Sequence, residues 1–144
     1  MVNYHVTVFT ADLLNATTLN NVHIKLVGTD SESEHTWLMG LRGASSFIRG
    51  ASSFTVSCST SLGNLVLIEL NKQCFRLFPE DSWFPAKVDV KSPEGDTYTF
   101  PIYRWITGSE VHRGTKAASK GLSVRAQSCI HICHLCYAYI PLCT

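Results

Sequence analysis

The chain has 144 residues, 45% of them hydrophobic and 16% charged, with a formal net charge of +1. This length allows one domain with a proper core and is short for two. No basic groove with interleaved aromatic residues is indicated, so we expect no nucleic-acid partner. The first residues lack the regions of a signal peptide, and no apolar run is long enough to span a membrane, so we expect a cytoplasmic protein.

Charge is unevenly spread along the chain. Residues 1–112 carry 8 Lys and Arg against 11 Asp and Glu, whereas residues 113–144 carry 4 basic residues and no acid. Such a shift indicates a boundary between segments. We therefore expect a folded domain over residues 2–112 and a poorly ordered, Cys- and His-rich tail over residues 113–144.

Apolar and polar residues alternate with a period of two along most of the chain before residue 101, a pattern typical of half-buried strands. These expected strands are residues 3–10, 21–28, 54–58, 87–91 and 97–100. Leu65–Leu70 is nearly continuously apolar, as expected for a strand covered on both faces. Turn-forming residues separate the strands, and no helical period precedes residue 109. The pattern predicts an all-β fold, an antiparallel sandwich of about seven or eight strands.

A short repeat interrupts this pattern. Arg42–Phe47 recurs as Arg49–Phe54, seven residues later. An odd offset would place equivalent side chains on opposite faces of one strand, so the repeat is not a simple strand repeat. We predict a surface loop that leads into a strand at Phe54.

The six cysteines are expected to be reduced in the cytoplasm. Cys58 and Cys74 lie in strand-like segments and are predicted to be small buried side chains. Cysteines and histidines crowd together after residue 128, but ligands spaced so closely cannot all converge on one zinc ion. We therefore expect no zinc site there.

One stretch is more specific than the strand pattern. The segment Phe100–Gly108 contains Phe-Pro-x-Tyr-Arg-Trp. Two other features precede it in the chain, first an opening Tyr4-x-Val6-x-Val8 strand and then an Asp81-Ser82-Trp83 segment. In this joint order the chain resembles the PLAT domain of animal lipoxygenases over about residues 2–112. Phe100–Gly108 then corresponds to the strand that closes the domain. The resemblance implies a C2-like sandwich that serves lipid-oxidising enzymes.

The resemblance also implies a catalytic body that this chain does not show. In lipoxygenases that body holds iron with histidines on long helices and with the carboxylate of a C-terminal isoleucine, whereas this chain ends in Thr144. We therefore expect no catalysis and no iron. A truncated, inactive isoform is one interpretation of the sequence.

PLAT domains commonly bind calcium through oxygen ligands from loops at one end of the sandwich. At the positions where the family has those ligands, this chain has Thr17-Thr18-Leu19 followed by Asn20, and Ser45, Ser46 and Ile48. Only Asp81 keeps its acid, with Thr18 and Asn20 as weak neighbours. One carboxylate with hydroxyls holds calcium poorly, so we expect weak calcium binding at most.

Apolar loop tips carry membrane docking in this family. The corresponding positions are Leu13-Leu14 and Leu77-Phe78. These side chains either contact lipid or fold back onto the sandwich, and the sequence does not choose between the two. Trp37 and Trp83 are expected in the core or at its rim.

Tyr103, Arg104 and Trp105 form a second candidate surface, with both aromatic rings expected on one face of the closing strand. Aromatic residues with arginine are typical of protein interfaces. Two functions therefore stay open. One is a lipid-interface module that attaches peripherally to a membrane, and the other is a module that docks a lipoxygenase catalytic domain or another protein.

Overall fold

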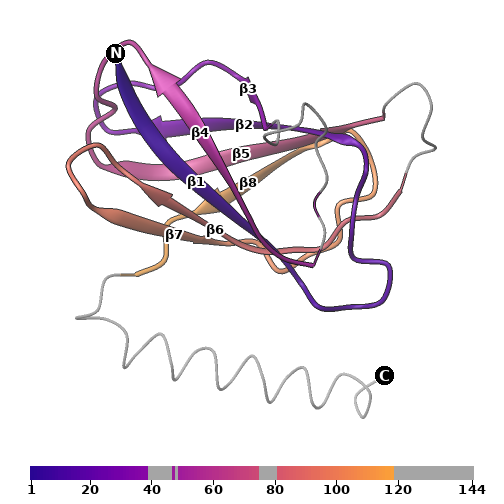
Figure 1. Ribbon diagram of the computed structural model, residues 1–144. Helices are drawn as coiled ribbons and strands as arrows, with labels where there is room; N and C mark the ends of the chain where they lie inside the picture. Colours follow the sequence, from indigo (N-terminus) through magenta and orange to yellow (C-terminus); the bar gives the residue numbers. More distant parts are fainter. Residues whose placement is uncertain (39–46, 48, 75–80, 119–144) are drawn as a thin grey trace.

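A computed structural model describes residues 1–38, 47, 49–74 and 81–118 of the chain (Figure 1). The described residues form eight strands and no helix, arranged as two four-stranded antiparallel sheets. The two sheets make a sandwich, which confirms the all-β fold expected from the alternation. Leu77 and Phe78 lie outside the described residues, as do Ser45, Ser46, Ile48 and the cysteines of the tail.

The first sheet has the strand order β4-β1-β6-β7 and the second has the order β3-β2-β5-β8. The strands of the first sheet are β1 (Val2–Thr10), β4 (Gly50–Cys58), β6 (Pro85–Lys91) and β7 (Thr97–Pro101). Those of the second are β2 (Asn21–Gly28), β3 (Thr36–Trp37), β5 (Leu65–Gln73) and β8 (Val111–Thr115).

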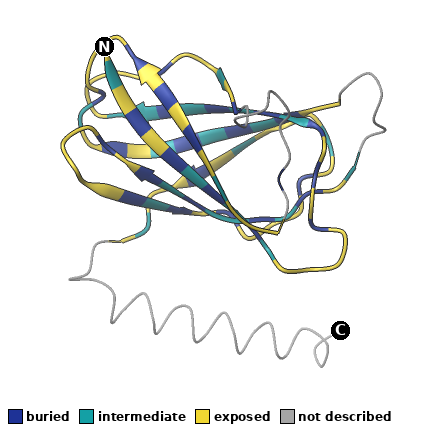
Figure 2. Cartoon of the chain, in the orientation of Figure 1, coloured by how far each residue is buried: buried dark blue, intermediate teal, exposed yellow. Residues whose placement is uncertain are grey.

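The core lies between the two sheets, where every second residue of the long strands is buried (Figure 2). In β1 the buried residues are Tyr4, Val6 and Val8, and in β2 they are Val22, Ile24 and Leu26. These are the apolar positions of the sequence pattern. Each fully buried aliphatic side chain contributes about 1.5–3 kcal/mol to the folded state, so the alternation itself sets which face of each strand turns inward.

The strand register places four connections at one end of the sandwich. Thr10 pairs with Pro85, Asn21 with Gln73, and Asn71 with Val111. The described parts of this end are residues 11–20, 38, 47, 49, 74, 81–84 and 102–110, and we call it the loop end. The connections at residues 29–35, 59–64 and 92–96 lie at the opposite end.

The last strand extends beyond the domain boundary expected after residue 112. β8 continues to Thr115 along the edge of β5, and Gly114 is buried where an added Cβ would lie 2.6 Å from Cδ1 of Ile102. Backbone hydrogen bonds then join Lys116 to Val66 and Ala117 to Thr99. The segment that the charge pattern assigned to a tail therefore begins with sandwich residues.

The sequence predicts Phe100–Gly108 as one closing strand, and this prediction is wrong. β7 ends at Pro101, and Tyr103 has a φ of 45°, which breaks the extended conformation. The chain pairs again only at Ile106, which forms an isolated bridge with Trp83. The alternation of Tyr103 and Trp105 about Arg104 therefore does not arise from a strand.

Three local expectations are also wrong. β4 begins at Gly50 rather than at Phe54, and Phe47 is buried with its ring 5.3 Å from that of Phe54. The two equivalent phenylalanines of the repeat thus meet in the core.

β5 is covered on one face only, since Val66 is 39% exposed. Cys74 is exposed, whereas Cys58 is buried as expected, and burial raises the pKa of its thiol.

Candidate functional site

Leu13 and Leu14 form the tip of the β1–β2 connection. The amide of Ala16 donates to the carbonyl of Leu13 at 3.2 Å, and Asn15 has a φ of 59°, so the chain turns tightly here. Asparagine tolerates this left-handed conformation better than most residues. The turn leaves Leu14 79% exposed and Leu13 exposed as well. Neither leucine folds back into the core.

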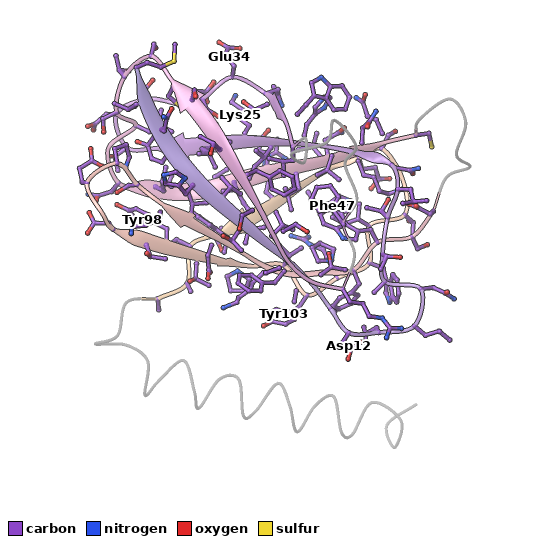
Figure 3. The ribbon with its side chains drawn as sticks, in the orientation of Figure 1. Asp12, Lys25, Glu34, Phe47, Tyr98 and Tyr103 are labelled. Carbon is purple, nitrogen blue, oxygen red and sulfur yellow. The ribbon has the colours of Figure 1, made fainter. Side chains whose placement is uncertain are left out.

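Phe84 anchors this turn to the rest of the loop end. Its carbonyl accepts from the amide of Ala11 at 3.0 Å, and its own amide donates to the carbonyl of Ala16 at 3.1 Å. Phe84 also meets Trp105 edge to face, with ring centroids 5.2 Å apart. The β1–β2 turn and the β7–β8 connection are therefore held together through one residue, and Figure 3 shows Asp12 and Tyr103 at the same end of the molecule.

The second candidate surface lies on the β7–β8 connection. Tyr103 and Trp105 are both exposed, by 59% and 43%. The amide of Tyr103 donates to the carbonyls of Pro85 and Ala86, which fixes the left-handed residue against β6. Nη2 of Arg104 donates to the carbonyl of Arg113 at 2.5 Å. The two aromatic rings thus stay available at the surface while the guanidinium ties β8 to this connection.

The other tryptophans have structural positions. Trp83 is fully buried, and its Nε1 donates to Oγ1 of Thr10 at 3.0 Å. Its ring lies 5.0 Å from that of Phe47. Trp37 is exposed on β3, with its ring against His23. Trp83 therefore belongs to the core and Trp37 to the rim.

The three residues expected as calcium-site candidates lie together. Oγ1 of Thr18 donates to Oδ1 of Asp81 at 2.5 Å, and the amide of Leu19 donates to Oδ2 at 3.0 Å. The amide of Asn20 in turn donates to Oγ1 of Thr18 at 3.0 Å. Both carboxylate oxygens of Asp81 thus accept hydrogen bonds from the β1–β2 connection.

A fourth member of this cluster was missed from the sequence. Lys72, on β5, is only 1% exposed, and its Nζ donates to the carbonyl of Asp81 at 2.6 Å and to Oδ1 of Asn20 at 3.2 Å. Nζ also lies 3.5 Å from Oδ1 of Asp81. The sequence carried a signal for this, because Lys72 continues the inward series of Ile68 and Leu70 at a spacing of two.

The described members of this cluster are a poor fit for calcium. Among the described residues, Asp81 supplies its one carboxylate, and the ammonium of Lys72 already lies against the oxygens that a cation would need. Calcium prefers six to eight oxygen ligands with several negative charges. In the described part of the chain, no group of three or more His, Cys, Asp or Glu residues is arranged to hold a metal ion.

A hollow of about 530 Å³ opens at the end opposite the loop end. Tyr98 lies on its wall, with the hydroxyl donating to Oδ1 of Asn64 at 3.1 Å and Nζ of Lys116 5.5 Å from the ring centroid. Burial, and the nearby charge of Asp96, raise the pKa of the Tyr98 hydroxyl. The sequence pattern does not predict this hollow, which is lined by residues of two connections, of β7 and of the segment that follows β8.

Among the described residues, no helix has the length and hydropathy needed to cross a membrane.

Comparison with known proteins agrees with this architecture. The profile of the PLAT/LH2 domain family matches residues 4–118. The human hydroperoxide isomerase ALOXE3 is 36% identical over 110 residues, which cover 75% of this chain and 15% of that protein. The 12R-type arachidonate 12-lipoxygenase of Rattus norvegicus is 31% identical over 120 residues, covering 83% of this chain and 17% of that protein.

Among solved structures, a calcium-dependent 11R-lipoxygenase superposes with a TM-score of 0.64 at 25% identity. The superposition covers 81% of this chain and 17% of that one. The chain thus spans about one sixth of the length of the lipoxygenases that it matches, and the matching region is the β-sandwich described above. This chain belongs to the PLAT/LH2 domain family, in the form found in lipoxygenases.

Proposed function

We propose that this PLAT domain is a non-catalytic module that attaches a cytoplasmic protein to the interface of a lipid membrane. The observation that carries the proposal is the exposure of five large apolar and aromatic side chains at the loop end. We call this group the apolar end patch, and its members are Leu13, Leu14, Leu19, Tyr103 and Trp105. They come from two connections that Phe84 holds together.

The chemistry of the patch suits a membrane surface. The leucine side chains at the turn can each contribute up to about 1.5–3 kcal/mol if they are fully buried among acyl chains. Tyrosine and tryptophan rings prefer the region of the lipid headgroups, where one edge of the ring is wet. Three exposed leucines and two rings therefore support reversible peripheral attachment and fall well short of a permanent anchor.

Calcium has at most a weak part in this proposal. The printed description of the 11R-lipoxygenase calls that enzyme calcium-dependent. In the present chain the candidate ligands Thr18, Asn20 and Asp81 are bonded to one another and to Lys72. We therefore expect vesicle binding to be the same with a calcium chelator as with calcium.

Flotation with neutral phosphatidylcholine vesicles tests the proposal. Replacing Leu14 by Ser removes the most exposed apolar side chain of the patch, so we expect binding to fall roughly tenfold, as for the loss of one buried leucine. Val66→Ser is the matched control, because Val66 is also exposed but lies away from the loop end. The proposal is wrong if the wild-type chain does not float, or if both variants lose binding equally.

Docking to another protein is the second candidate function. It is favoured by the exposed rings of Tyr103 and Trp105 beside Arg104, since aromatic residues and arginine are enriched at protein interfaces. Capture of an isolated lipoxygenase catalytic domain by the wild-type chain, and loss of capture in Trp105→Ser, would support this function. An inactive module with no separate role is the third alternative, and it predicts neither vesicle binding nor capture.

A further inference from the structure

We propose that Lys72 is a positioning residue that supplies the loop end with a built-in cation. Its ammonium holds the β1–β2 connection against the segment before β6, so that Leu19 is presented in the apolar end patch without a metal ion. The contribution of Leu19 to lipid binding rests on the function proposed above. The role of the ammonium is a property of the domain alone.

The position of Lys72 is unusual for a lysine. It occupies the last inward-facing site of β5 and is buried, although lysine is almost never fully buried unless its charge is paired. Its Nζ contacts Asn20 at the start of β2 and both the carbonyl and the carboxylate of Asp81 ahead of β6. β2 and β6 belong to different sheets, so this single group joins the two layers at the loop end.

Asp81 passes this constraint on to the β1–β2 connection. Its carboxylate accepts from the hydroxyl of Thr18 and from the amide of Leu19. Thr18 and Asn20 are buried, whereas Leu19 between them is 49% exposed. Because the backbone of Leu19 is fixed from the inside, its side chain is directed outward.

Among the residues that the structure describes, the charges of the cluster balance without a metal ion. The carboxylate of Asp81 faces the ammonium of Lys72, and the other contacts of that ammonium are neutral oxygens. Lys72 is buried and Asp81 is partly exposed, so the carboxylate serves as the partner that a buried ammonium needs. A divalent ion added here would bring unbalanced positive charge beside Lys72. The loop end therefore keeps one arrangement whether or not calcium is present.

Amide hydrogen exchange of the full chain, without lipid, tests the positioning role. The measured quantity is the exchange rate at Leu19 relative to that at Val6 in the core of β1. Lys72→Met removes the charge and keeps most of the volume, and we expect it to raise this ratio roughly tenfold or more, as the constraint on Asp81 is lost. Lys91→Met removes a charge from an exposed lysine of β6 and is expected to leave the ratio unchanged.

Two further results decide the matter if Lys72→Met does not fold. Asp81→Asn keeps the shape of the side chain but removes its charge, and it is expected to raise the same ratio. In the wild-type chain, millimolar calcium should leave the ratio as it is in a chelator. An unchanged ratio in the variants, or added protection by calcium in the wild type, would overturn the proposal.

Vesicle flotation separates this inference from the function on which it partly rests. Leu19→Ser and Lys72→Met are both expected to weaken binding to neutral vesicles several-fold, but only Lys72→Met should speed exchange at position 19. If the wild-type chain does not float, the lipid function fails, while the exchange experiment still decides the role of Lys72. Faster exchange in Lys72→Met with unchanged flotation would show that Lys72 does not present Leu19 to lipid.

Discussion

At the scale of single residues, His112 on the edge strand of the second sheet makes the stability of the domain depend on pH. It is half-buried on β8 opposite Leu70, and its Nε2 has no hydrogen-bond partner among the described residues. Burial lowers the pKa of its imidazole below the usual 6.5, and the positive charge of Arg104 lowers it further. Burial and His35 lower the pKa of His23 in the same way. Both histidines therefore favour the neutral form in the folded domain.

This shift predicts that the domain loses stability in mild acid. Because the folded pKa of His112 is lowered, the unfolded chain binds the proton more tightly, and stability rises with pH in this range. The contribution is fully present above the unfolded pKa of about 6.5 and is lost as the pH falls below it. We expect the melting temperature to fall between pH 7.5 and 5.5, and His112→Gln to make that fall smaller.

His5→Gln is the matched control, since His5 is exposed on β1. Only a partial effect is expected from His112→Gln, because His23 also contributes. An equal change in the pH dependence for both variants would contradict the assignment to His112.

At the scale of elements, β8 decides where the folded domain ends. Residues 111–115 pair with β5, and the amides of Lys116 and Ala117 bond to carbonyls of residues in β5 and β7. Without β8, β5 would become an edge strand and Ile68 would lose cover from the backbone of Gly114. The strand therefore completes the second sheet rather than leading away from it.

Truncation tests this directly. A chain ending at residue 118 should keep its β-type circular dichroism and its cooperative melt, because it retains every described strand. A chain ending at residue 110 should melt at a clearly lower temperature or fail to fold, since one whole edge of strand pairing is lost. Equal melting temperatures for the two would show that β8 is not part of the cooperative unit.

The long strands could be predicted from the sequence because their burial and their alternation have the same cause. Val6 and Val8 are apolar at every second position, and only one face of β1 meets the other sheet. Tyr103 could not be placed in this way, because its positive φ depends on backbone contacts with Pro85 and Ala86, which are distant in sequence. The alternation of apolar and polar residues continues through Tyr103 by chance, without a strand.

The candidate site shows the same division. Thr18, Asn20 and Asp81 were identified through a family resemblance, and the structure brings them together. Lys72 was missed because a lysine in an alternating strand is usually assigned to the solvent face. Its spacing of two from Ile68 and Leu70 was a signal for an inward position, but a strong one only once the register of β5 is known, and that register depends on pairings with strands before and after it in the chain.

At the scale of the whole molecule, attraction to lipid does not depend on net charge. The apolar end patch lies at one end of the sandwich, and residues 1–112 carry more acidic than basic side chains. We therefore expect binding of the chain ending at residue 118 to neutral vesicles to change little between low salt and 0.5 M salt, about five times the ionic strength at which screening already acts over 10 Å. Vesicles with anionic lipid should bind this chain no better than neutral ones. A steep loss of binding with salt would indicate an electrostatic attachment instead.

The strand order also governs how the chain can acquire its fold. Val2 pairs with Cys58 and His5 pairs with Lys91, so the first strand to be synthesised lies between two partners that are made much later. Sandwiches dominated by such distant pairings fold slowly, on the order of milliseconds to seconds, because a long loop must close before any contact rewards it. During translation one backbone edge of β1 therefore stays unpaired until β6 has left the ribosome, and this interval is when the nascent chain is most exposed to aggregation and most in need of chaperones.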